Sequence, residues 1–310
     1  MTFVLPLSTM APLAASTTAA TASAHSPTVL ATAPATAAPT EALAPWLHLA
    51  SQAGAQAPWL FLALLTTVGL ISWLGGRVLL RQPHPTPTVG SAPPTLMLVL
   101  RLGAGFGLIV GCAALFAEIA EALQAGAVLG RLDEAFILGM IDQVPAALLQ
   151  AFYGLTFLSN RASQYALGIS VALLLLWGRR PWLALGWALA VAGNGLLNTT
   201  LKHVFERARP EHPTPWLTET GFSFPSGHSS GAVVTFGMLA YLATRLLPAR
   251  WHLPALVAAA MVAFSVGASR IFLRVHFPSD VLAGFSSGLA WLTVCIVSIE
   301  LVRWYRRLRA

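Results

Sequence analysis

The sequence SRIFLRVHFPSD, residues 269–280, joins two strongly apolar runs that cover residues 253–270 and 280–302. Each run is close to the roughly 20 residues that a membrane-spanning helix needs. The polar residues of the joining segment therefore gather at one end of two spanning helices. Five further runs upstream have the same apolar character: residues 58–80, 97–121, 162–178, 181–201 and 229–247. We predict an all-α polytopic membrane protein.

The composition supports this prediction. Of the 310 residues, 56% are apolar and 9% are charged, whereas about 25% are charged in an average globular protein. So few charges cannot cover a soluble chain, which argues against a water-soluble enzyme, a disordered protein and a nucleic-acid binder. The net charge of +7 does not change this conclusion, because of where the charges lie. Cys112 and Cys295 lie inside apolar runs, so neither a disulfide framework nor a cysteine metal site is expected.

The N-terminal stretch differs from the rest of the chain. Residues 1–57 are rich in Ala, Thr, Ser and Pro and carry a single charge, Glu41. That composition predicts a low-complexity disordered tail. The Ala-Ser-Ala at residues 22–24 resembles a signal-peptide cleavage site. The segment before it has no Lys or Arg and is interrupted by Pro6, so we favour an uncleaved tail.

Residues 132–160 are amphipathic rather than uniformly apolar. Pro145 breaks this stretch, and only Arg161 separates it from the next apolar run. We therefore predict an interfacial or re-entrant helix here instead of an eighth crossing.

The basic residues indicate how the chain is oriented. With seven crossings, one side receives Arg77, Arg81, Arg101, Arg179, Arg180, Arg245, Arg250, Arg303, Arg306, Arg307 and Arg309. We predict that this side is cytoplasmic. The other side receives Arg131, Arg161, Lys202, Arg207, Arg209, Arg270 and Arg274. So many cations on an outer face suggest a chemical role, since the later two loops on that face are dense in polar residues.

Three segments on the predicted outer face hold nearly all of the unusual polar residues. The Lys202 segment, LKHVFERARP at residues 201–210, follows the fourth run and contains the only lysine in the chain. Asn194, Asn198 and Lys202 are spaced by four and therefore share one face of a helix. A basic interfacial anchor is the alternative. However, anchors are not preferred on this face, and arginine supplies every other basic position.

The His228 segment, FSFPSGHSSG at residues 222–231, enters the fifth run. Pro225 suits a first helical turn, where Ser226 and Gly227 would leave backbone N–H groups free. Such a helix start is a candidate anion site, towards which His228 could point. Taken alone, an ordinary serine cap followed by a solvated histidine is the simpler interpretation.

The His276 segment is the opening stretch, residues 269–280. His276 and Asp280 are four apart, so a helical turn would let the carboxylate orient the imidazole. Asp280 could also be the N-cap of the last helix, and one residue can fill both roles. Arg270 and Arg274 add cationic donors.

Together the three segments supply cations, a helix start and two histidines, one of which has a carboxylate partner. Cations and amide dipoles match the equatorial oxygens of a phosphoryl group in transfer. One histidine can attack phosphorus while the other gives a proton to the leaving oxygen. Each segment alone is weak evidence, but their convergence on one face predicts phosphoryl transfer.

The chain resembles the type 2 phosphatidic acid phosphatase superfamily, whose soluble relatives include vanadium haloperoxidases. That family has three signatures: K-x6-R-P, P-S-G-H and S-R-x5-H-x3-D. Here they read Lys202 to Arg209-Pro210, then Pro225-Ser226-Gly227-His228, then Ser269-Arg270 with His276 and Asp280. The resemblance covers residues 95–303 and implies a six-helix phosphatase core. Residues 58–94 would add one extra N-terminal transmembrane helix and a cytoplasmic loop, and residues 304–310 a basic cytoplasmic tail.

The resemblance also implies the role of each site residue. The phosphate oxygens would be held by Lys202, Arg209, Ser226, Gly227 and Arg270. His276 would be the nucleophile that forms a phosphohistidine, and Asp280 would fix its tautomer. His228 would protonate the leaving group and then activate water. No metal and no cofactor are implied, and Arg207 and Arg274 are left as supporting charges.

Other functions fit the residues less well. A metal site built from His203, Glu206, Glu211 and His212 matches no compact zinc pattern. A transporter would need ionisable residues at mid-membrane, whereas here they cluster at the helix ends. A haloperoxidase would need bound vanadate. A lipid phosphotransferase of the same superfamily stays open.

The signatures bind a phosphate and do not identify the lipid. Phosphatidic acid, phosphatidylglycerol phosphate, undecaprenyl diphosphate and lipid A phosphates all remain candidates. The expected partners are this lipid phosphate and the bilayer, with no nucleic acid, and the oligomeric state is not predicted. The Ala-rich, Arg-over-Lys composition suggests a GC-rich bacterium. In such a bacterium the protein would lie in the inner membrane, with its site on the periplasmic or extracellular face.

Overall fold

The structure is a computed structural model that describes residues 40–81, 94–124, 128–215, 217 and 219–309. The described helices all belong to one compact unit, Thr36–Ala310. They are α1 (Thr40–Ala55), α2 (Ala57–Arg81), α3 (Pro94–Gln124), α4 (Val128–Met140), α5 (Ala146–Thr156), α6 (Arg161–Trp177), α7 (Pro181–Phe205), α8 (Gly227–Leu246), α9 (His252–Phe272) and α10 (Pro278–Arg309), with short 3-10 turns η1 (Phe157–Ser159) and η2 (Ala249–Trp251). The described part of the chain contains no strand, and the predicted all-α class is confirmed.

The long helices coincide with the predicted apolar runs. Among the described residues, four helical stretches have the length and apolarity to cross a membrane: Ala57–Leu80, Leu102–Gln124, Ala249–Phe272 and Pro278–Arg306. The helix α6 is apolar but spans only 17 residues. The chain is therefore a polytopic membrane protein, and the total of seven crossings stays a prediction.

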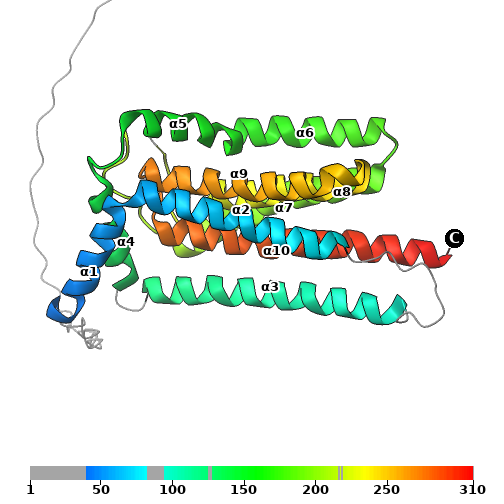
Figure 1. Ribbon diagram of the computed structural model, residues 1–310, viewed down its shortest axis with the longest axis horizontal. Coiled ribbons are helices and arrows are strands. Elements are labelled where there is room, and N and C mark those ends of the chain that lie inside the picture. Colours follow the sequence, from blue (N-terminus) through cyan, green and yellow to red (C-terminus); the bar gives the residue numbers. More distant parts are fainter. Residues whose placement is uncertain (1–39, 82–93, 125–127, 216, 218, 310) are drawn as a thin grey trace, which may run out of the picture. The chain divides into compact units, whose positions relative to one another are not determined.

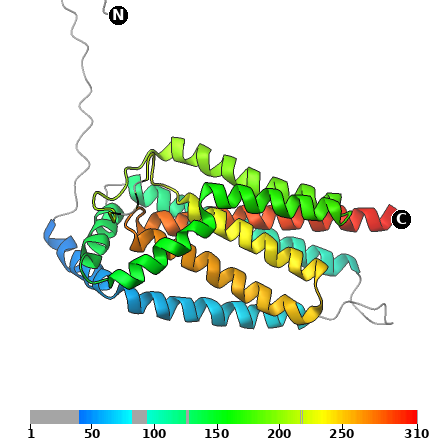
Figure 2. The same cartoon turned by 90° about the horizontal axis from the view of Figure 1, so that it is seen from above.

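The helices pack around α10, which contacts α3, α7, α8 and α9 (Figures 1 and 2). Between α7, α8 and α10 lies a core that contains Trp187, Val234 and Met238, none of them exposed. The outer helices α2, α3 and α6 keep large apolar side chains exposed, including Trp73, Leu79, Phe106, Val110, Ile169 and Leu173. Such an apolar exterior would be unfavourable in water and matches the hydrocarbon of a bilayer.

The two ends of the helix bundle hold different loops and different charged residues. In Figure 1 the C-terminal ends of α2, α6, α8 and α10 lie at one end, together with the starts of α3, α7 and α9. The α7–α8 and α9–α10 loops lie at the opposite end, where α1 and α4 also sit. All three polar segments therefore belong to one end of the bundle, and most of the arginines outside them belong to the other.

The N-terminal helix α1 differs from the prediction, because residues 40–55 were assigned to the disordered tail. This helix packs along α4. The two backbones approach so closely that a Cβ on Gly54 would lie 2.1 Å from the Phe136 carbonyl oxygen, and one on Gly139 would lie 2.1 Å from that of Ser51. Composition could not reveal this contact, since it depends on small residues in a distant helix. Residues 1–39 lie outside the described residues.

The predicted break in residues 132–160 is present. Helix α4 ends at Met140, and α5 begins at Ala146 directly after Pro145. Proline lacks the N–H that a continuing helix would use, so a new helix starts behind it. The side chain of Asn160 then caps α6 by accepting a hydrogen bond from Ser163 N at 2.8 Å.

The first turns of α10 lie directly against the start of α8. A Cβ on Gly284 would sit 2.5 Å from the carbonyl oxygen of Ser226. In the same region Ser226 N donates a hydrogen bond to the carbonyl oxygen of Asp280 at 3.0 Å. The absence of a side chain at Gly284 therefore fixes how closely two of the three polar segments approach.

We expect Gly284→Ala to destabilise the fold by about 1–3 kcal/mol and to lower activity, because the new methyl group must push α10 away from α8. The control is Gly107→Ala on α3, where a Cβ meets nothing within 4 Å. Thermal unfolding in detergent would measure both variants. A Gly284→Ala protein as stable and active as the Gly107→Ala control would contradict the proposed importance of this contact.

Candidate active site

The three polar segments meet through backbone contacts between their loops. Ser223 N donates to the carbonyl oxygen of Arg207 at 2.7 Å. The guanidinium of Arg209 donates to the carbonyl oxygen of Val275 at 2.8 Å and to that of Gly221 at 3.0 Å. Ser226 N, which donates to the carbonyl oxygen of Asp280, joins the remaining two segments, so the polar side chains of all three form one site.

His276 lies at the centre of this site and is 2% exposed. Its Nε2 is 3.2 Å from Nη1 of Arg209. An arginine can only donate, so Nε2 must be the nitrogen that carries the lone pair. The proton of the neutral ring is then on Nδ1, which lies 3.2 Å from Ser223 Oγ and 3.4 Å from Asp280 Oδ2.

Asp280 is fully buried and its carboxylate is held from several directions. Oδ2 accepts from Ser223 Oγ at 2.5 Å and from the backbone N–H of Phe277 at 2.9 Å. Oδ1 accepts from Arg207 Nη1 at 2.7 Å. Helix α10 begins at Pro278, so Asp280 lies in its first turn and is not the N-cap that the sequence suggested. Its carboxylate accepts from the preceding Phe277 N–H and faces His276 at the same time, as the spacing of four predicted.

Two residues of this group were not predicted as site residues. Ser223 is fully buried between His276 and Asp280, although it lies inside the quoted His228 segment. Arg207 was left as a supporting charge, yet it bonds directly to Asp280. Helix α7 ends at Phe205, and Glu206 directly after it adopts a left-handed conformation with φ of 45°. Helical spacing from Lys202 therefore cannot place the arginines that follow.

Three predicted phosphate-binding cations occupy the same region. Nζ of Lys202 donates to the carbonyl oxygens of Phe222 and Ser223. Arg270 is 1% exposed, and its guanidinium donates to Thr156 Oγ1 at 2.6 Å and to Glu219 Oε1 at 2.5 Å. Its Nε has no hydrogen-bond partner among the described residues.

The carboxylate of Glu219 balances these cations. Besides its ion pair with Arg270, its charge acts on both Lys202 and Arg209. Glu219 is 27% exposed, so it reaches the site from the solvent side rather than from the core. One carboxylate thus interacts with all three cations, and no sequence signature pointed to it.

The start of α8 differs from the prediction in one respect. Pro225 lies before the helix and not in its first turn, and Ser226 is the N-cap. The Ser226 hydroxyl accepts hydrogen bonds from Ser229 N at 3.4 Å and from Ser229 Oγ at 2.9 Å. The serine cap of the simpler sequence interpretation is present, but His228 is half-buried and not the solvated histidine of that interpretation.

The predicted polar face of α7 packs on this helix start. Asn194 and Asn198 each approach Ser230 Oγ with Nδ2 at 3.4 Å. A Cβ on Gly227 would lie only 2.7 Å from Asn198 Oδ1, so glycine is needed there for the two helices to meet. His228 follows in the first turn, where the charges of Arg270 and of the other site cations act on its ring.

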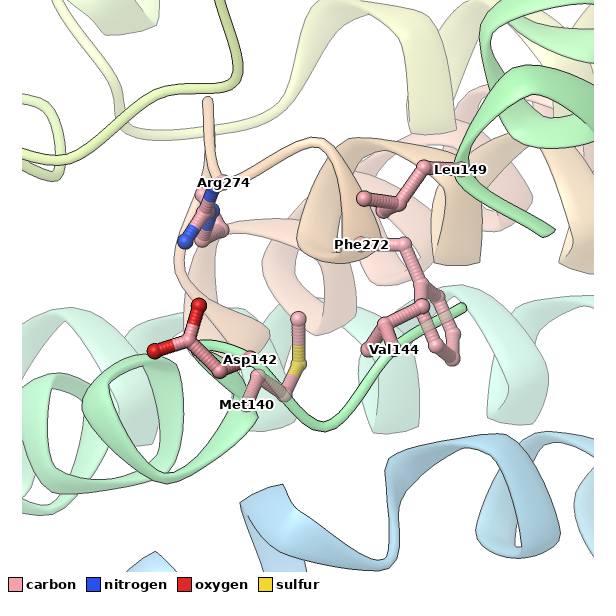
Figure 3. A pocket seen from close by; sticks show the side chains of 6 residues that line it. All are labelled: Met140, Asp142, Val144, Leu149, Phe272 and Arg274. Carbon is pink, nitrogen blue, oxygen red and sulfur yellow. The ribbon is translucent and has the colours of Figure 1, made fainter. Parts of the chain in front are cut away.

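Within the described residues, no hydrogen bond or ion pair joins the Arg274 side chain to the predicted phosphate-binding residues. Arg274 adopts a left-handed backbone with φ of 55° and lines a separate hollow of about 110 Å³. Figure 3 shows Arg274 and Asp142 on one side of this hollow, opposite Val144, Leu149 and Phe272. Its place in the sequence beside Arg270 therefore does not make it part of the site.

The residues considered for a metal do not come together. Nowhere in the described ranges do three His, Cys, Asp or Glu side chains gather closely enough to hold an ion. His203, one of the four considered, packs edge-to-face on Phe222 with ring centroids 5.8 Å apart.

Comparison with known proteins agrees with this geometry. The PAP2 superfamily model matches residues 181–304. Phosphatidylglycerophosphatase B of Bacillus subtilis is 35% identical over 144 residues, which are 46% of this chain and 70% of that protein. The chain belongs to the PAP2 superfamily. The resemblance drawn from the three signatures is confirmed, and the protein is a membrane lipid phosphatase of PAP2 type.

Other PAP2 relatives extend the comparison. The crystal structure of the transmembrane PAP2 phosphatidylglycerolphosphate phosphatase from Bacillus subtilis has a TM-score of 0.59 and 31% identity, and the match covers 63% of this chain and 96% of that one. Lipid A 1-phosphatase of Rhizobium johnstonii is 33% identical over 122 residues, 36% of this chain and 46% of that protein. Undecaprenyl-diphosphatase of Sulfolobus acidocaldarius is 29% identical over 151 residues, which are 47% of this chain and 69% of that protein.

Burial keeps the His276 ring neutral. It lowers the pKa of His276 to about 3, even though the hydrogen bond and charge of Asp280 act in the opposite direction. Burial also lowers the pKa of the Arg209 guanidinium. The His276 ring is therefore neutral near pH 7, as its hydrogen bonds require.

This shift predicts how stability depends on pH. In the unfolded chain a histidine titrates near 6.5, so between about pH 3 and 6.5 the unfolded state binds a proton that the folded state does not. Stability should rise with pH through this window and fall on acidification. We expect the thermal midpoint in detergent to fall more between about pH 7.5 and 5 for the wild type than for His276→Asn. An equal fall in both proteins would contradict the lowered pKa.

Proposed function

We propose that this PAP2 protein removes a phosphate from a lipid through a phosphohistidine formed on His276, without a metal ion. The observation that carries the proposal is the orientation of the His276 ring. Its Nδ1 faces Asp280 and Ser223, while its Nε2 lies 3.2 Å from the guanidinium of Arg209. A nucleophilic imidazole needs this arrangement, with its N–H held by acceptors and its lone pair directed towards the cations that bind the phosphate.

Lys202, Arg209 and Arg270 would hold the phosphate oxygens, assisted by Ser226 and the Gly227 amide. Arg270 has a buried Nε with no partner among the described residues, which leaves a donor for an anion. An incoming phosphate would replace the Glu219 carboxylate at Arg270. Exchange of one anion for another avoids leaving a buried guanidinium without a negative partner.

The reaction would proceed in two displacements. In the first, the Nε2 lone pair attacks phosphorus, the bond between phosphorus and the lipid oxygen breaks, and His228 gives a proton to that oxygen. In the second, water attacks phosphorus while His228 takes its proton. The P–N bond breaks, its electron pair returns to Nε2, and inorganic phosphate leaves. The cations stabilise the charge on the equatorial oxygens in both steps.

His228 must be protonated to act as the acid in the first step. Burial, and after it the positive charges of Arg270, Arg209 and Lys202, lowers the pKa of His228 and opposes this protonation. A phosphate dianion bound to the same cations would offset their charge and favour the imidazolium. Substrate binding would therefore create the acid that the leaving oxygen requires.

The substrate would be an amphiphilic phosphate or diphosphate. Phosphatidylglycerol phosphate is favoured, because the PAP2 relative from Bacillus subtilis that carries this name aligns over most of its length. Undecaprenyl diphosphate is the second candidate, from the name of the Sulfolobus relative. If an alcohol replaced water in the second displacement, the same site would act as a lipid phosphotransferase.

The placement in the cell and the domain limits are part of the proposal. The arginine-rich end of the bundle would face the cytoplasm, so that the active site opens to the periplasmic or extracellular side of a bacterial inner membrane. Residues 95–303 would form the PAP2 domain and residues 58–94 an added helix and cytoplasmic loop. Residues 304–310 would form a basic cytoplasmic tail.

The two histidines can be distinguished by the leaving group. His276→Ala should abolish turnover and the covalent phosphoenzyme. His228→Ala should lose about 10²–10⁴-fold in the phosphorylation step on a lipid monoester, whose alkoxide needs a proton. It should lose much less on a nitrophenyl ester, whose leaving group needs little help. A single-turnover burst isolates this step, because His228 also serves the later hydrolysis. Trapped phosphohistidine at His228, or a burst retained by His276→Ala, would reverse the assignment.

Activity should survive chelation and be inhibited by vanadate. Five-coordinate vanadate resembles the phosphoryl transition state, and three cations are present to bind it without a metal. Phosphate release from a panel of lipid phosphates in detergent, with and without chelator, is the measurement. Loss of turnover in chelator that a divalent ion restores would rule out the metal-free mechanism.

A further inference from the structure

Asp133 is a buried carboxylate that lies outside all three signature segments. It belongs to α4 and is 4% exposed. It accepts hydrogen bonds from Arg207 Nη2 at 2.8 Å, from the backbone N–H of Ser279 at 3.2 Å, and from the Ser279 hydroxyl. Its partners belong to the α7–α8 loop and to the first turn of α10. Asp133 therefore bridges two of the segments that build the active site.

Arg207 joins Asp133 to the carboxylate beside the nucleophile. Its Nη1 donates to Asp280 Oδ1 at 2.7 Å and to Ser279 Oγ at 2.7 Å, while Nη2 donates to Asp133. The guanidinium also lies over the Phe277 ring, 4.2 Å from its centroid. A planar guanidinium held at two edges and one face has little freedom to turn. It fixes Oδ1 of Asp280, and thereby the direction in which Oδ2 faces His276.

The charges of this group explain why a second carboxylate is useful. Arg207 and Asp280 alone would form a neutral pair. With Asp133 the three groups carry a net charge of −1 in the ionised form that their hydrogen bonds indicate. Phosphorylation of Nε2 on a ring that keeps its Nδ1 proton creates positive charge on the imidazole, and a net negative group beside it stabilises that charge. Burial raises the pKa of Asp133, but Arg207 and the Ser279 hydrogen bonds favour its ionised form.

We propose that Asp133 is a positioning residue for the nucleophile, which acts through Arg207 to orient Asp280 and to preserve its negative charge. This proposal rests on the phosphohistidine mechanism proposed above. Helix α4 is itself held in place on its other side by α1, where the two backbones touch at Gly54 and Gly139. A helix before the matched PAP2 residues 181–304 would thus contribute to the arrangement of the reacting group.

The test is a double-mutant cycle measured by single-turnover phosphoenzyme formation. It uses the lipid phosphate that the full-length protein turns over fastest in detergent. Asp133→Asn should lower the phosphorylation rate at least about tenfold, with KM unchanged within about twofold. The control is Glu134→Gln, an exposed neighbour on the same helix, which should keep the wild-type rate. Because Asp133 acts through Asp280, adding Asp133→Asn to Asp280→Asn should cost less than about threefold more.

The outcomes separate this inference from the proposed function. A wild-type rate in Asp133→Asn, or losses that multiply in the double variant, would overturn the positioning role. A wild-type enzyme that forms no phosphohistidine would instead overturn the mechanism. If Asp133→Asn does not fold, the cycle is run with Ser279→Ala, which removes one donor to Asp133 and leaves the charges. Its smaller loss should also vanish in the Asp280→Asn background, and multiplying losses there would equally exclude the proposal.

Discussion

The fully buried carboxylate of Asp280 is the group on which the site depends. A charge without access to water must be satisfied by donors from the protein, since the cost of leaving it unpaired is several kcal/mol. Those donors come from three places: Ser223 before α8, Phe277 before α10, and Arg207 after α7. None of the three lies in a membrane-spanning stretch. Satisfying one carboxylate therefore draws the loops at one end of the bundle together and orients His276 in the process.

The membrane determines which parts of the chain can carry these polar groups. The outer helices expose apolar side chains that suit hydrocarbon, and packing between helices relies on glycines that let backbones touch. The charged side chains of the candidate site lie at the helix ends and in the loops. A phosphate on a lipid lies at the depth of the helix ends, while the acyl chains lie in the hydrocarbon region of the bilayer. The charged end of the bundle thus matches the phosphate of an amphiphilic substrate, and the apolar helix surface matches its hydrocarbon part.

Much of this arrangement is predictable from the sequence, and the limits have physical causes. Apolar runs predict the long helices, because length and hydropathy are local properties, and Pro145 predicts the break between α4 and α5. Signature spacing correctly brings His276 and Asp280 together. Helix α1 was missed, since its stability comes from contact with α4 and not from its own composition. Ser223, Glu219 and Asp133 were missed because their partners are distant in the chain.

The missed residues share a property that the signatures lack. In the proposed mechanism the signature residues touch the phosphate or the reacting nitrogen, so the chemistry of phosphoryl transfer would fix their types. The supporting residues bind other side chains, and several residue types can satisfy a guanidinium or a carboxylate. Glu219 forms an ion pair with the buried Arg270, and Asp133 forms one with the half-buried Arg207. The two carboxylates differ in exposure: Glu219 is partly exposed, as the proposed exchange for a phosphate requires, whereas Asp133 is buried, as a positioning role requires. This difference in exposure arises from the folded chain, so the sequence alone could not assign the two carboxylates different roles.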